Sequence, residues 1–171
     1  PVASVATGTE TPIDKSASTV TVITAKDISD MGVADLDQAL ALVPGLFISR
    51  SPQAYFPKYI FRGLTSTYNP EALLLINGIA VKSLFTGNRG HVLSTMPIKA
   101  IKRIEVIRGP GSALYGADAF AGVINIITYP AKELKNEAGI RLGSFDTVGG
   151  WLSQAMHKGD AYAGVTLEYQ Q

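Results

Sequence analysis

The sequence predicts an α+β fold, with a small mixed four-stranded β-sheet, short helices and a short antiparallel β segment after them. Three observations lead to this prediction. Short apolar runs alternate with capped helical segments in the first half, a glycine-rich stretch then separates two strand-like runs, and three alternating segments follow. With 171 residues, the chain is long enough for one domain with a proper core.

The stretch Pro97–Thr128 organises the predicted sheet, after a short helix expected over Pro97–Lys102. Arg103–Ile107 (RIEVI) alternates apolar and charged residues with a period of two, which predicts a half-buried strand. Val123–Thr128 (VINIIT) is almost entirely β-branched, which is typical of a strand covered on both faces. Glycines between the two strands permit sharp turns. They are Gly109, Gly111, Gly116 and Gly122.

Two short helices are expected near the N-terminus. Thr24 is placed as the N-cap of a helix over Ala25–Met31, because its hydroxyl can accept a hydrogen bond from an unpaired backbone N–H. A second helix over Asp35–Val43 has apolar residues at i, i+4 and i+7, which form one stripe for core packing. These residues are Leu36, Leu40 and Val43. Pro44-Gly45 ends this helix.

Short apolar runs predict the remaining strands of the first 130 residues. They are Ser18–Ile23, Leu46–Arg50, Tyr59–Arg62, Ala72–Ile76 and Ile79–Lys82. Asn77-Gly78 separates the last two runs and predicts a type I′ hairpin, because both central residues of that turn need positive φ.

The two ends of the chain differ from its centre. Residues 1–16 are small and polar and predict a flexible arm, residues 17–130 form the expected main domain, and residues 131–137 a charged linker. Residues 138–171 predict three antiparallel strands, at Ala138–Phe145, Gly149–His157 and Ala161–Gln170. Each is close to the length of a transmembrane β-strand, about 9–11 residues.

Composition and motif spacing argue against several functions. The net charge of +1 gives no basis for nucleic-acid binding, and the absence of cysteine excludes thiolate chemistry. The glycine-rich stretch lacks the lysine of a phosphate loop and the glycine spacings of a dinucleotide fingerprint or a nucleophile elbow. The two histidines, His91 and His157, fall in different segments. We therefore expect no enzyme, no catalytic residue, no metal site and no cofactor.

Four stretches together resemble the plug domain of a TonB-dependent outer-membrane receptor. They are TETPIDKSASTVTVITAKDI, LDQALALVPGLFI, FRGLTSTYNPEALLLINGIAV and PIKAIKRIEVIRGPGSALYGADAFAGVINIIT, which span about residues 9–130 in order. The resemblance implies a globular plug inside a 22-stranded β-barrel of a Gram-negative outer membrane. It implies import of a scarce nutrient such as a ferric siderophore, haem or cobalamin. TonB, the energy-supplying partner, would pull a box near the N-terminus, where PVASVAT departs from the family's run of valines.

The resemblance also implies site residues. By position, Arg62 and Arg108 match plug arginines that pair with glutamates on the barrel wall. Solvation of both arginines is the open alternative. The loops Ser51–Lys58, Leu64–Pro70 and Ser83–Arg89 match the outward-facing plug apices, with ordinary exposed loop residues as the alternative to ligand contacts. The ligand candidates are Gln53, Tyr55, Tyr68, Asn69, Phe85, Asn88 and Arg89.

Residues 138–171 match the first barrel strands of the family. Three strands cannot close a barrel, for which about eight is the smallest number, so the chain is expected to correspond to a portion of a receptor. Their open edges predict packing on the plug or self-association with another copy. The runner-up hypothesis is a stand-alone periplasmic plug-like binding protein without a barrel.

Overall fold

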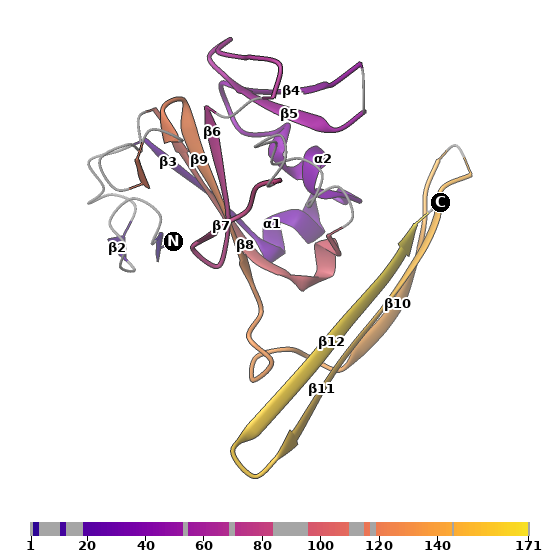
Figure 1. Cartoon of the computed structure of the whole chain (residues 1–171). Helices are drawn as coiled ribbons and strands as arrows, with labels where there is room; N and C mark the ends of the chain where they lie inside the picture. The colour runs from indigo at the N-terminus through magenta and orange to yellow at the C-terminus, as the bar shows by residue number, and fades with distance from the viewer. Residues whose placement is uncertain are drawn as a thin grey trace.

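The computed structural model describes residues 2–3, 11–12, 19–52, 55–68, 71–83, 96–109, 115–116, 119–144 and 146–170. A five-stranded mixed sheet lies at the centre of the fold, in the order β3-β8-β9-β6-β7 (Figure 1). Its strands are β3 (Val20–Thr24), β8 (Ile101–Arg108), β9 (Gly122–Thr128), β6 (Ala72–Ile76) and β7 (Ile79–Ala80). The predicted α+β class is confirmed, with five strands in place of four because the short β7 adds an edge.

The pairing within this sheet is mixed. β6 and β9 are parallel, whereas β3–β8, β8–β9 and β6–β7 are antiparallel. A separate two-stranded sheet joins β4 (Leu46–Arg50) to β5 (Pro57–Phe61). In the segment expected to be an arm, β1 (Val2–Ala3) pairs with β2 (Thr11–Pro12).

The first helix begins where its predicted cap places it, the second begins one residue later than expected, and both end earlier than expected. In α1 (Ala25–Asp30), the Thr24 hydroxyl accepts from the Asp27 N–H, while the Asp27 carboxylate accepts from the Thr24 N–H at 2.8 Å. α2 (Leu36–Leu40) is capped by Asp35, and its predicted last turn is replaced by tighter bonds such as Val43 N–H to Leu40 O. The helix predicted at Pro97–Lys102 is a 3₁₀ turn, η3 (Ile98–Ala100). None of the helices within the described ranges is long and apolar enough to span a membrane.

Both faces of the central sheet are buried. One face packs against α1, α2 and the β4–β5 hairpin, and the stripe predicted for the second helix, Leu36, Leu40 and Val43, lies in this core. The opposite face forms a smaller cluster that includes Leu73, Ile107 and Val123, with Tyr115 packed against it.

The prediction that Arg103–Ile107 is half-buried is wrong. Ile104, Glu105, Val106 and Ile107 are all buried, and Glu105 has no exposed surface. The alternation of charged and apolar residues is misleading here because the Arg103 Nε–H donates to Glu105 Oε1 at 2.7 Å, so that two charges share one buried face.

The predicted Asn77-Gly78 turn is confirmed, with φ of 50° at Asn77 and 81° at Gly78. The Asn77 side chain also joins this hairpin to β9. Its Oδ1 accepts from the Thr128 N–H at 2.9 Å, and its Nδ2 donates to Thr128 Oγ1 at 2.9 Å. The turn residue therefore fixes the position of β7 at the edge of the sheet.

A three-stranded antiparallel sheet follows the central domain. Its strands are β10 (Glu137–Leu142), β11 (Val148–Lys158) and β12 (Ala161–Gln170). The β11–β12 hairpin projects well away from the body of the molecule (Figure 1). The residue pairing places Ile140, Leu152 and Leu167 on one exposed face, and Arg141, Trp151 and Glu168 on the other.

Candidate functional site

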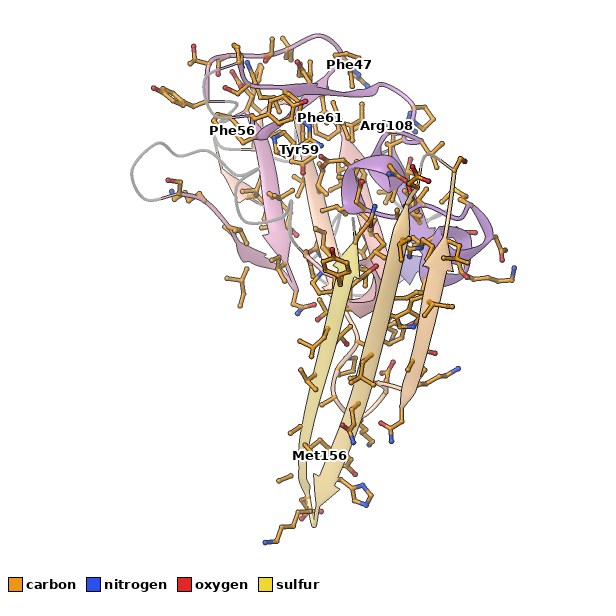
Figure 2. The ribbon with its side chains drawn as sticks, turned by 90° about the vertical axis from the view of Figure 1, so that its right-hand side faces the viewer. Phe47, Phe56, Tyr59, Phe61, Arg108 and Met156 are labelled. Carbon is orange, nitrogen blue, oxygen red and sulfur yellow. The ribbon has the colours of Figure 1, made fainter. Side chains whose placement is uncertain are left out.

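The β4–β5 hairpin forms one end of the molecule. Aromatic side chains of β5 pack into the core beneath it. Figure 2 shows Phe47, Phe56 and Phe61 at this end, opposite Met156 at the far tip of β11. Tyr59 and Phe61 are buried at 2% and 1% exposure, whereas Phe47 is 66% exposed. Firm packing beneath the hairpin therefore supports a surface that leaves aromatic groups in solvent. We call this end of the molecule the apex.

Tyr55, a predicted ligand residue, is held in an unusual backbone conformation at the apex. Its φ is 54°, a left-handed value that is rare for a bulky residue. The Tyr55 N–H donates to Ser51 O at 2.8 Å, and the Ser51 N–H donates to Phe56 O at 2.9 Å, which close the loop around it. The ring is 78% exposed, and the Arg50 guanidinium lies 5.9 Å from its centroid. The loop thus presents an aromatic ring beside a cation.

A partly buried carboxylate joins this hairpin to α2. Asp37, in the first turn of α2, lies 2.5 Å from Arg50 Nη2 and accepts a hydrogen bond from the Tyr59 hydroxyl at 3.0 Å. Burial raises the pKa of Asp37, although Arg50 and the Tyr59 hydroxyl act in the opposite direction. Burial, followed by the Asp37 charge, raises the pKa of Tyr59 well above its ordinary value of 10.0. The cluster sets the position of Arg50 at the apex.

This pKa shift predicts a pH-dependent stability. Because the folded-state pKa of Asp37 is raised above its ordinary value of 3.8, the folded state binds this proton more tightly than the unfolded state. Its contribution to stability is therefore present at low pH and is lost as the pH rises through the raised pKa. We expect Asp37→Asn to be progressively less destabilising, relative to wild type, as the pH rises across that window. Urea unfolding at a series of pH values measures this difference, and a difference that is flat with pH would contradict it.

The two predicted barrel-facing arginines meet at one turn. The backbone N–H of Arg62 donates to Gly45 O at 3.1 Å, and Arg108 Nη1 donates to Pro44 O at 3.1 Å. Arg62 is exposed and has a φ of 50°, while Arg108 is partly buried. Among the described residues, Arg108 Nε is buried and has no hydrogen-bond partner. Figure 2 places Arg108 near the aromatic residues of the apex.

The remaining predicted ligand residues are only partly described. Tyr68 is 49% exposed. The other five lie outside the described residues, namely Gln53, Asn69, Phe85, Asn88 and Arg89. Over the described ranges, no group of three or more His, Asp or Glu side chains is arranged to hold a metal.

Sequence reasoning missed three residues of the apex, Asp37, Arg50 and Tyr59. They are far apart in the chain, and each fits an ordinary local role as a helix first-turn acid, a strand-end base and a strand aromatic. One signal was available for Arg50, which ends an apolar strand just as Arg62 and Arg108 do.

Comparisons with known proteins agree with this geometry. The family model described as TonB-dependent Receptor Plug Domain matches residues 12–123. The vitamin B12 transporter BtuB of Vibrio vulnificus is 36% identical over 121 residues, which cover 70% of this chain and 19% of that protein. The chain therefore spans about a fifth of the length of this relative.

Two solved structures of outer-membrane receptors are also similar to this chain. The alcaligin outer-membrane receptor FauA of Bordetella pertussis has a TM-score of 0.79 at 22% identity, with 99% of this chain and 29% of that chain covered. The ferric yersiniabactin uptake receptor FyuA of Yersinia pestis has a TM-score of 0.67 at 28% identity, with 88% and 24% covered. The first of these likenesses shows the fold alone.

Proposed function

The chain belongs to the family of TonB-dependent receptor plug domains, and from this premise we propose that it forms the plug and first wall strands of an outer-membrane nutrient importer. The observation that supports this proposal most strongly is the family match over residues 12–123, together with a structural likeness that covers 99% of the chain. The relatives are transporters and uptake receptors, and the chain is not an enzyme.

The β10–β12 sheet supports its assignment to the barrel wall. β11 and β12 have 11 and 10 residues, the length that a tilted strand needs to cross a bilayer. One face of this sheet exposes apolar side chains, among them Ile140 at 77% and Leu167 at 60%, as expected for a surface in contact with lipid. A stand-alone periplasmic protein would gain nothing from such a face.

The apex supports a role in contacting the nutrient. Tyr55 is exposed, and the Arg50 side chain is 41% exposed beside it. Aromatic rings and a guanidinium together suit a ligand that carries negative charge and flat conjugated groups. A ferric siderophore meets this description better than a neutral ligand, and haem and cobalamin are the other members of the proposed class.

Arg62 and Arg108 support a closed position of the plug within the wall. Arg108 Nε is buried without a partner in the described part of the chain, and Arg62 is exposed at the same turn. A buried guanidinium gains most from a bidentate carboxylate. Pairing with wall carboxylates would hold this turn in place until TonB, acting at the N-terminal segment, opens a path.

Titration of the chain with ferric siderophores, haem and cobalamin tests the proposed ligand contact. We expect saturable binding of one class, and Tyr55→Ala should weaken it about fivefold, because a stacked aromatic contact contributes on the order of 1 kcal/mol. Tyr162→Ala is the matched control, since Tyr162 is 50% exposed and pairs with His157 next to Met156, at the far end of the β11–β12 hairpin. Equal effects of the two substitutions would contradict the apical site.

A further inference from the structure

A second cluster of charged and aromatic side chains lies where the three-stranded sheet meets the plug. Lys99 Nζ, from η3, lies 4.2 Å from the centroid of the Trp151 ring in β11. The backbone N–H of Lys99 donates to Glu168 Oε2 in β12 at 3.3 Å. Arg141 in β10 reaches Glu168 Oε1 at 3.5 Å and donates to Ala34 O, between α1 and α2, at 3.4 Å. Each of the three strands thus supplies one side chain.

The sheet is shaped to receive the Trp151 ring. Gly139 pairs with Trp151 across β10 and β11, and a Cβ on Gly139 would lie only 2.2 Å from Trp151 Cζ2. The ring therefore lies flat over a strand position that only glycine can provide. The Arg141 guanidinium is 6.0 Å from the ring centroid, so a second cation adjoins the ring.

Two hollows adjoin Lys99, so close packing around this residue is incomplete. A cavity of about 290 Å³ lies between α1, η3, the linker and Ser153. A smaller one of about 110 Å³ is lined by Ile28, Lys99, Arg141 and Trp151. Because close packing is interrupted beside the cluster, we expect its polar and cation–π contacts to contribute to the orientation of the sheet on the plug.

We propose that Lys99, Trp151, Arg141 and Glu168 form an anchor that holds the plug to the wall. The anchor attaches to η3, directly before β8, and to the α1–α2 connection. Within the described part of the chain, β3 is an edge strand whose strand partner is β8, and none of its residues contributes to the anchor. β3 can therefore separate from the sheet while η3 stays docked. The separation of β3 under a pull by TonB rests on the proposed function. The docking of the three-stranded sheet on the plug does not depend on that function.

Trp151 is the only tryptophan, so its fluorescence reports on the anchor directly. In the full chain we expect Lys99→Met, which keeps the stem and removes the charge, to increase the undocked population about threefold to thirtyfold. Acrylamide quenching of Trp151 should rise accordingly, while far-UV circular dichroism stays unchanged. Lys99→Arg should restore the shielding, and Lys158→Met, at the hairpin tip, is the charge-matched control.

Amide hydrogen exchange supplies the second measurement. The Lys99 amide should be protected more strongly than the amides of β3, and Lys99→Met should accelerate its exchange by the same threefold to thirtyfold. Equal quenching of Lys99→Met and Lys158→Met, or exchange of the Lys99 amide together with β3, would overturn the proposal. These readouts need no nutrient and no TonB, so a failure of the transport function leaves them unaffected.

Discussion

Glu105→Ala is expected to lower the free energy of unfolding by about 3–5 kcal/mol, the usual loss when one partner of a buried ion pair is removed. Glu105 has no exposed surface, and the side chain of its partner Arg103 is only 12% exposed. The substitution leaves the guanidinium beside the core cluster of Leu73, Ile107 and Val123 without this carboxylate. Denaturant unfolding followed by circular dichroism measures the loss.

An exposed ion pair of the same chain provides the control. Asp30→Ala removes the partner of Lys26 at the surface of α1, where water screens both charges, so no measurable change in stability is expected. Tyr115 gives an independent readout, because its pKa is raised by burial and then by the Glu105 charge. Glu105→Ala should lower that pKa. Equal stabilities of Glu105→Ala and Asp30→Ala would show that the pair contributes nothing.

Gly122→Ala is expected to cost about 3 kcal/mol, at the upper end of the usual cost of overpacking a core. A Cβ at Gly122 would lie 2.8 Å from Ile107 O and 2.8 Å from Phe61 Cζ. Neither atom can yield easily, since one belongs to the paired backbone of β8 and the other to a ring that is 1% exposed. The close approach joins the apical hairpin to the first residue of β9. Thermal or urea unfolding of the variant measures the cost.

Gly150→Ala is the matched control for this effect. Gly150 also lies within a strand, but its added Cβ would meet only Gly139 O, at 3.4 Å. We expect a change near zero or a slight gain, because alanine loses less conformational freedom than glycine on folding. Phe61→Leu should recover part of the loss in the Gly122→Ala background, and strict additivity of the two substitutions would contradict a direct clash.

Local signals were sufficient for much of the fold. The Thr24 cap, the Asn77-Gly78 turn and the apolar stripe of α2 each involve residues close together in sequence, so their patterns predicted the observed elements. The boundaries of β4 and β6 also agree with their apolar runs. The resemblance to the receptor family added the prediction of a plug domain, and the family match over residues 12–123 confirms it.

The candidate site was less accessible to sequence reasoning. Tyr55 could be chosen as a loop aromatic, but its positive φ and its place beside Arg50 depend on the closed hairpin loop. The Asp37–Arg50–Tyr59 cluster could not be predicted, because each residue has a common local role and only the packing of β4–β5 on α2 joins them.

By itself the sequence determined the elements, the family and the alternating strands of the last thirty or so residues, because these depend on neighbours along the chain. The tertiary structure alone decided which charges are buried and which elements they join. Glu105 was misread as a solvent-facing residue of a half-buried strand, and Lys99 and Trp151 showed no pattern. Burial is set by what covers a strand from elsewhere in the chain, so a period of two along β8 cannot distinguish a solvated face from a second core.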